Sequence, residues 1–183
     1  AQQDGGITSC AYTVTELVRE DWTELYSADE LAHWGVANTL HVVGMAHGLI
    51  GLPSEWHCHQ AGSMPWHSAG SIFVGSGISR QGIPFSYHAD WKSKGRWSVD
   101  LHTDGTSYRM CPLEKLFAKS DALAEWEEVP VTAFDEGLKA GVAEQVAAIL
   151  SPGVQRLLPW ISMDDTVKLT EFGEAVFGYE SSA

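Results

Sequence analysis

The chain has 183 residues, with 11 Lys and Arg against 24 Asp and Glu, so its formal net charge at pH 7 is −13. Proteins bind phosphate backbones and anionic lipid through clusters of basic groups. An excess of acidic residues repels both of these partners. We therefore expect neither nucleic acid nor a membrane as a partner. With 44% hydrophobic residues, the composition is that of a soluble protein, cytoplasmic or secreted after processing. Its length suits a single domain over residues 1–183, and the sequence does not indicate an oligomeric state.

The first fifty residues are expected to form two helices. Thr13-Val-Thr-Glu16 has the form of a capping box, and apolar residues follow it at helical spacing. Ser27-Ala-Asp-Glu30 repeats this signal before a second helical run, which Gly51-Leu-Pro53 ends. His41 and Met45 stand four residues apart on the second helix, and we interpret them as core residues rather than haem ligands.

Between residues 55 and 110 the hydrophobic period shifts toward two, which is typical of strands. Segments 72–74, 84–91, 96–103 and 106–110 predict a β-meander. Asp104-Gly105 is a strong hairpin turn, and it pairs Asp100 with Arg109. A loop at residues 93–95 would then join the two preceding strands and place His88 across from Asp100.

After Pro112 the pattern returns to helices at residues 113–124, 134–150 and 153–160, with an extended stretch at 127–132. The chain therefore predicts an α+β fold. It would have N-terminal helices, a central antiparallel β-meander or small barrel, and C-terminal helices.

The stretch from Trp56 to His67 is rich in groups that bind metals. Strand alternation would point His57 and His59 to one face, so that two imidazoles converge from one element. The third ligand is expected to be His88, with His102 or His67 as substitutes. Fe, Zn, Mn, Cu and Ni all suit such a donor set, so the sequence predicts one transition metal ion without naming it.

The predicted polar strand face would supply the remaining groups. Asp100 and Asp90 would orient imidazoles or act as a general base, together with His102 as a catalytic residue. Arg109 would neutralise a carboxylate substrate or stabilise an oxyanion. Four tryptophans would form the pocket wall or the core beneath it: Trp56, Trp66, Trp91 and Trp97. We expect a metal-dependent lyase, isomerase or oxygenase acting on a small organic substrate.

Two local patterns resemble known families. The order His57, His59, Gly75, Pro84 and His88 resembles the cupin pattern, although the Glu that usually follows the His-x-His pair is missing. This resemblance implies a β-barrel that holds a metal.

The second pattern, His57-Cys58 followed by Pro65-Trp66-His67, resembles the copper segment of the cupredoxin-type nitrite reductases. Ile72 stands where the axial Met would be expected. The helical character of the first fifty residues also departs from that all-β family, so we do not expect a blue-copper site.

Two alternatives remain open. The first is a small-ligand-binding domain that is not an enzyme and has a Trp-rich pocket. The second is a Cys–His hydrolase with Cys10 as nucleophile at the start of the first predicted helix. In that arrangement His102 would act as base, oriented by Asp100 or Asp104.

Overall fold

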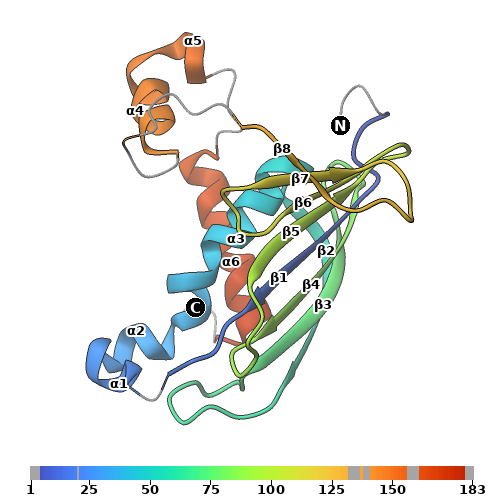
Figure 1. Cartoon of the computed structure of the whole chain (residues 1–183). Coiled ribbons are helices and arrows are strands. Elements are labelled where there is room, and N and C mark those ends of the chain that lie inside the picture. The colour runs from blue at the N-terminus through green and yellow to red at the C-terminus, as the bar shows by residue number, and fades with distance from the viewer. Residues whose placement is uncertain (1–4, 20, 132–136, 138–140, 156–160, 180–183) are drawn as a thin grey trace.

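A computed structural model of the chain describes residues 5–19, 21–131, 137, 141–155 and 161–179. Its centre is an open sheet of eight strands in the order β2-β3-β4-β1-β5-β6-β7-β8 (Figure 1). In chain order the strands are β1 (Ser9–Thr15), β2 (Pro53–Ala61), β3 (Ile72–Ser79), β4 (Pro84–Asp90), β5 (Trp97–His102), β6 (Ser107–Met110), β7 (Leu116–Lys119) and β8 (Glu127–Val129).

The first strand of the chain lies in the middle of the sheet. β1 runs parallel to β4 and antiparallel to β5, and every other neighbouring pair is antiparallel. β1 therefore joins two antiparallel groups, β2–β4 and β5–β8. The described strands do not form the doubly wound parallel sheet that is typical of dinucleotide-binding domains.

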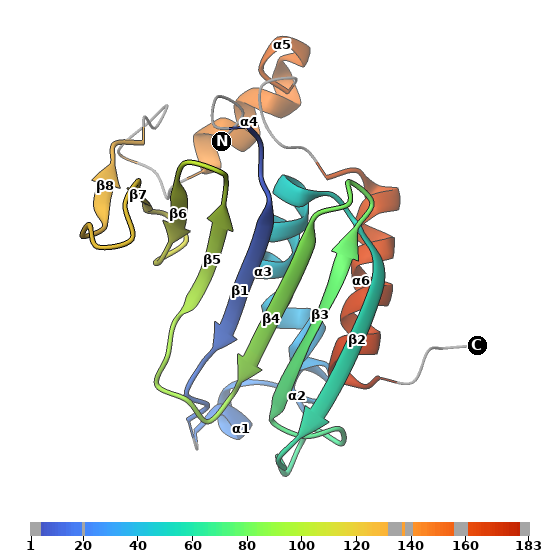
Figure 2. The ribbon, with the colours of Figure 1, turned by 90° about the vertical axis from the view of Figure 1, so that its right-hand side faces the viewer.

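The described helices cover one face of the sheet and leave the other bare, as Figure 2 shows. α3 packs on β1 and β5, and α6 packs on β2, β3 and α3. α4 and α5 pack on each other and project beyond the sheet (Figures 1 and 2). The helices are α1 (Trp22–Leu25), α2 (Ala28–Ala32), α3 (Trp34–Ile50), α4 (Val142–Leu150), α5 (Pro152–Gln155) and α6 (Met163–Phe177).

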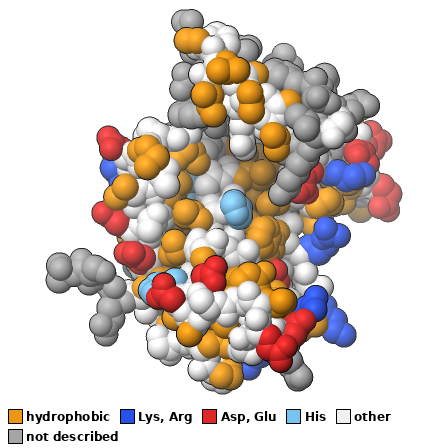
Figure 3. Space-filling model, turned by 90° about the vertical axis from the view of Figure 1, so that its left-hand side faces the viewer, with side chains coloured by type: hydrophobic (Ala, Val, Ile, Leu, Met, Phe, Trp, Pro, Cys, Tyr) orange, Lys and Arg blue, Asp and Glu red, His pale blue; other side chains and the backbone are white. Residues whose placement is uncertain are grey.

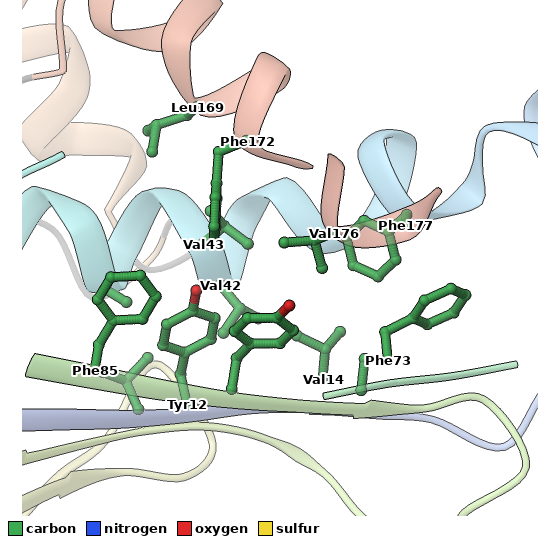
Figure 4. Close-up of a cluster of buried hydrophobic side chains, with 14 of the residues drawn as sticks. Tyr12, Val14, Val42, Val43, Phe73, Phe85, Leu169, Phe172, Val176 and Phe177 are labelled. Carbon is green, nitrogen blue, oxygen red and sulfur yellow. The ribbon is translucent and has the colours of Figure 1, made fainter. Parts of the chain in front are cut away.

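The core lies between the sheet and the pair α3 and α6. Side chains alternate along β1, so that Cys10, Tyr12 and Val14 point toward the helices and are at most 3% exposed. Phe172 of α6 reaches down between the helices and the strands (Figure 4) and is 1% exposed. Burying one such side chain contributes about 2–3 kcal/mol, so this apolar layer is the main source of stability.

Glycines on β3 allow the aromatic core to reach the sheet. A Cβ on Gly75 would collide with the Tyr87 side chain and the His57 carbonyl, and one on Gly77 would collide with Phe85 and the Glu55 carbonyl. β3 therefore lies directly beneath two rings of β4, and this packing needs hydrogen in place of a side chain.

The predicted fold arrangement was wrong. The segment around Thr13 is the central strand β1 rather than a helix, because Cys10, Tyr12 and Val14 alternate toward the core. The predicted helix at residues 113–124 contains β7, and the sheet is open and mixed rather than a meander or barrel. Residues 132–136, 138–140 and 156–160, on which parts of other predicted elements fall, lie outside the described residues.

The predicted hairpin turn was confirmed, whereas the predicted pairing of β4 with β5 was wrong. The Asp104-Gly105 turn joins β5 to β6 and pairs Asp100 with Arg109, as the turn sequence indicates. β4 and β5 do not pair, because β1 lies between them. His88 stands beside Thr13 rather than Asp100.

Candidate functional site

The residues predicted to form a site share the bare face of the sheet. Alternation along β2, β4, β5 and β6 places their side chains on the side away from the helices (Figure 2). They are His57, His59, His88, Asp100, His102 and Arg109.

Strand order spreads these residues across the sheet. The register runs from His57 through Ser76, Ser86 and Ala11 to Asp100, four strand steps or roughly 19 Å at about 4.8 Å per step. His59 and His88 are separated by Val74 of β3. Among the residues that the structure describes, no three His, Cys, Asp or Glu side chains come close enough to hold a metal ion. The prediction of a histidine-rich metal site was wrong.

His67, the alternative third ligand, lies in the core and not on the bare face of the sheet. It is 2% exposed, and its ring contacts Phe73, Trp91 and Tyr179. Its ring therefore belongs to the core rather than to the bare face.

Asp100 and Arg109 form a cross-strand ion pair. Arg109 Nε and Nη2 donate to the two carboxylate oxygens at 2.8 and 2.7 Å, and this bonding to Asp100 raises the pKa of Arg109. The guanidinium also lies 4.5 Å from the centre of the Trp126 ring. Two N–H donors and one face of the guanidinium therefore already have partners within the chain.

The Cys–His hydrolase alternative was also wrong. Cys10 points into the core from β1, whereas His102 is on the bare face of β5 and bonds Ser107 Oγ at 3.0 Å through Nδ1. Burial, followed by the charge of Asp100, raises the pKa of the Cys10 thiol to about 12. A buried, protonated thiol on the opposite face from its base cannot act as the nucleophile.

A different group of polar residues lies on the helical side, where β1 ends beneath the first half of α3. We name it the β1–α3 cluster: Glu16, Asn38, His41 and Trp97. Asn38 Nδ2 donates to Glu16 Oε2 at 2.7 Å, and the His41 and Trp97 rings are 6.5 Å apart. Burial raises the pKa of Glu16, and the hydrogen bond from Asn38 opposes the shift.

His41 is the solvent-facing member of this cluster. It is exposed on α3, three residues after Asn38 and therefore next to it on the helix surface. Figure 3 shows the helical side of the molecule, where hydrophobic side chains are exposed over much of the surface. An exposed imidazole beside an indole is suited to exchange a proton with a bound molecule.

The sequence interpretation missed this cluster. Glu16 was interpreted as part of a capping box, and His41 as a core residue. The exposed residues His33, Ala37 and His41 follow one another at intervals of four, and this spacing marks the outer stripe of α3. This four-residue spacing is the sequence signal that could have identified the cluster.

No protein-family model matches the sequence, and no curated protein matches it either. Solved structures do match. UDP-N-acetylglucosamine 3-dehydrogenase GnnA from Acidithiobacillus ferrooxidans is 10% identical with a TM-score of 0.67, over 97% of this chain and 55% of that one. An aldose-aldose oxidoreductase from Caulobacter crescentus, in complex with glycerol, is 10% identical with a TM-score of 0.70, over 95% and 53%.

A third match is the WlbA dehydrogenase from Bordetella pertussis in complex with NADH and UDP-GlcNAcA. It is 11% identical with a TM-score of 0.60, over 96% of this chain and 54% of that one. This chain has the fold of about half of each oxidoreductase.

These matches complete the correction of the expected function. At such identities they show the fold alone, but the proteins that share it are named as dehydrogenases and oxidoreductases, and one contains NADH. A lyase, isomerase or oxygenase with one transition metal is not supported, because the described residues contain no group of three metal ligands. The small-molecule ligands named for the neighbours, UDP-GlcNAcA and glycerol, agree in class with the small-molecule partner expected here. None of the described helices is long and apolar enough to cross a membrane.

Proposed function

We propose that this chain is the substrate-side half of a nicotinamide-dependent oxidoreductase that acts on a sugar or sugar nucleotide. The observation that carries the proposal is the shared fold, which extends over 97% of this chain and 55% of a UDP-sugar dehydrogenase. The aldose-aldose oxidoreductase and the NADH-containing dehydrogenase support the same class of reaction.

The described residues do not fit the dinucleotide itself. A dinucleotide-binding domain places the pyrophosphate at a helix N-terminus that directly follows a parallel strand and a glycine-rich turn. Here α3 follows the short helix α2, with His33 between them, and the sheet is mostly antiparallel. The proposal therefore assigns the cofactor, which accepts or donates the hydride, to polypeptide outside the described residues.

Within this half, the β1–α3 cluster is the proposed substrate site. The His41 imidazole would accept the proton of a substrate hydroxyl, as histidines commonly do in acid–base catalysis. Trp97 would form an apolar wall beside it. Asn38 and Glu16 would hold the first half of α3 against the end of β1 and so position His41.

The test uses the longest natural polypeptide that contains this sequence. It is incubated with NAD⁺ or NADP⁺ and a panel of aldoses and UDP-sugars, and the absorbance of the reduced nicotinamide is followed. We expect reduction with at least one sugar. His41→Ala should lower kcat/KM by about 100-fold or more, the usual contribution of a general base.

The matched control is His59→Ala, which removes an exposed histidine from the opposite face of the sheet and should leave kcat/KM within about twofold. Absence of reduction with either nucleotide across the whole panel would overturn the proposed function. Equal loss of activity in the two variants would overturn the role of His41.

A further inference from the structure

The connection between β4 and β5 concentrates positive charge on an otherwise acidic chain. It spans residues 91–96 and lies at the end of the sheet opposite the β3–β4 turn (Figure 2). Lys92, Lys94 and Arg96 fall within five positions, although the whole chain has only 11 basic residues against 24 acidic ones. Residues 91–99 contain no Asp or Glu. Such a local excess of positive charge attracts anions to this part of the surface.

The three basic side chains of this connection are available to a ligand. Lys92, Lys94 and Arg96 are exposed, and the described residues provide no ion-pair partner for any of them. Arg19 differs from them, because its guanidinium is already paired with Asp21. Unpaired guanidinium and ammonium groups form strong charge-assisted hydrogen bonds with phosphate oxygens.

Hydrogen bonds hold the backbone of the connection against the end of β1. The Thr13 and Thr15 hydroxyls donate to the Arg96 carbonyl at 3.1 and 2.9 Å. Gly95 N–H donates to Ser93 Oγ at 3.2 Å, and a Cβ on Gly95 would collide with Thr15. The backbone that carries the basic residues is therefore fixed before a ligand arrives, which lowers the entropic cost of binding.

The connection also borders the β1–α3 cluster. Trp97, a member of that cluster, directly follows Arg96 in the chain. Glu16, another member, donates its backbone N–H to the Asp90 carbonyl at the start of the connection, at 3.0 Å. The His41 ring is 6.5 Å from the Trp97 ring. One tryptophan thus separates the basic connection from the proposed proton acceptor.

A nucleoside diphosphate sugar has groups that suit both parts of this region. Its diphosphate is bonded directly to the sugar ring, so a ring that lies against Trp97 brings a phosphate next to residue 96. A neutral aldose would leave the three basic side chains without a role. Two of the structural neighbours are named with such compounds, UDP-N-acetylglucosamine and UDP-GlcNAcA.

We propose that the β4–β5 connection binds the diphosphate of a nucleoside diphosphate sugar. Arg96 would donate two parallel hydrogen bonds to the phosphate oxygens, and Lys92 and Lys94 would add positive charge. The sugar ring would lie against Trp97, with a hydroxyl toward His41. This inference rests on the proposed function for the sugar end of the site, and it narrows the substrate from any sugar to a sugar nucleotide.

Binding is measured by isothermal titration calorimetry of the 183-residue chain with UDP-glucose, in the absence of nicotinamide. We expect saturable binding with a Kd below about 1 mM at low salt. Added NaCl should weaken it, because salt screens exposed charges. Methyl α-D-glucopyranoside lacks the diphosphate and should bind at least about tenfold more weakly.

Substitutions then test the two ends of the site. Arg96→Gln should weaken UDP-glucose binding about tenfold through loss of the charge-assisted pair. Arg80→Gln is the matched control and should bind like the wild type, because Arg80 is also exposed but lies in the β3–β4 turn at the other end of the sheet. Trp97→Leu should weaken the binding of UDP-glucose and leave that of inorganic pyrophosphate unchanged. Urea unfolding verifies that each variant is folded.

Four results would overturn the proposal. The first two are no saturable binding of UDP-glucose, and equal affinities of Arg96→Gln and Arg80→Gln. The third is pyrophosphate bound as tightly as UDP-glucose with no effect of Trp97→Leu, which would show a patch for any anion. The fourth is NADH bound through Arg96 in preference to UDP-glucose, which would assign the connection to the cofactor.

The two proposals can fail separately. UDP-glucose binding that depends on Arg96 would stand even if the enzyme oxidised no sugar, which would refute the proposed function alone. Oxidation of neutral aldoses by an enzyme that does not bind UDP-glucose would refute this inference and leave the proposed function standing.

Discussion

Asn38 donates a 2.7 Å hydrogen bond to Glu16 and so ties the first half of α3 to the residue that follows β1. Burial raises the pKa of Glu16, and the hydrogen bond from Asn38 only partly offsets this effect. A carboxyl with a raised pKa in the folded state favours folding in its protonated form. That contribution is present below the unfolded pKa and is lost as the pH rises through the folded pKa.

We therefore predict that Glu16→Gln raises the free energy of unfolding at neutral pH. The amide stays uncharged at every pH and keeps an oxygen that accepts from Asn38. The difference from the wild type should shrink as the pH falls toward the ordinary pKa of a glutamate. Urea unfolding followed by tryptophan fluorescence at several pH values measures it. A variant less stable than the wild type at pH 7 would contradict the prediction.

A second prediction concerns the Asp100–Arg109 pair. Asp100 is 19% and Arg109 40% exposed, and two hydrogen bonds hold them together, so Asp100→Asn should cost about 1 kcal/mol of unfolding free energy. Glu128→Gln breaks the more exposed pair with Lys115 and should cost less than about 0.5 kcal/mol. Equal losses in the two variants by urea unfolding would show that the bidentate geometry adds nothing.

His47 should destabilise the fold in acid. Its Nδ1–H donates to the Gly51 carbonyl and its Nε2 accepts from the Tyr12 hydroxyl, while burial lowers its pKa to about 4. An unfolded histidine binds its proton more readily, so stability is complete above about pH 6.5 and falls as the pH drops toward 4. The full effect is about 3 kcal/mol.

The variant His47→Gln cannot titrate in this range. Its free energy of unfolding should therefore fall less steeply than that of the wild type between pH 7 and pH 4, as measured in urea. Parallel curves for the two proteins would rule out His47 as the source of the acid sensitivity.

Gly75→Ala should disrupt the core beneath the sheet. The new methyl group would collide with the His57 carbonyl and the Tyr87 hydroxyl, and we expect a loss of about 3 kcal/mol. Gly105→Ala, where nothing lies within 4 Å of the added atom, should stay within about 0.5 kcal/mol. Thermal and urea unfolding of both variants give the comparison, and similar losses would contradict the expected crowding at Gly75.

Transition metals should leave the stability unchanged. A ligand that binds the folded state raises the unfolding midpoint by mass action. The described residues bring no three suitable donors together, so equimolar Zn²⁺ or Ni²⁺ should not shift the midpoint relative to EDTA. A shift that His57→Ala abolishes would restore the metal hypothesis.

Local signals in the sequence were sufficient where partners are close along the chain. The Asp104-Gly105 turn predicts the pairing of Asp100 with Arg109, because nine residues and one tight turn determine that register. The period-two pattern likewise places His57 and His59 correctly on one face of β2.

The rest depended on a pairing that no local pattern reveals. β1 enters the sheet between β4 and β5, and its partners are more than seventy residues away. With β4 and β5 treated as neighbours, His88 and Asp100 appeared to be one site. The segment Thr13-Val-Thr-Glu16 satisfies a helix-start pattern, but burial of Tyr12 and Val14 between sheet and helices outweighs that local preference.

The central position of β1 has a consequence for how the protein is made. Among the described strands β1 is synthesised first, yet neither of its neighbours is complete until synthesis has reached Asp90. Until then its unpaired edges need shielding from other chains. Cleavage of the chain within residues 16–19 would also separate β1 from the two antiparallel groups, β2–β4 and β5–β8, each of which keeps its own strand pairing. A synthetic peptide of residues 1–15 added to the remainder should therefore reassemble the sheet, as in a split-protein pair.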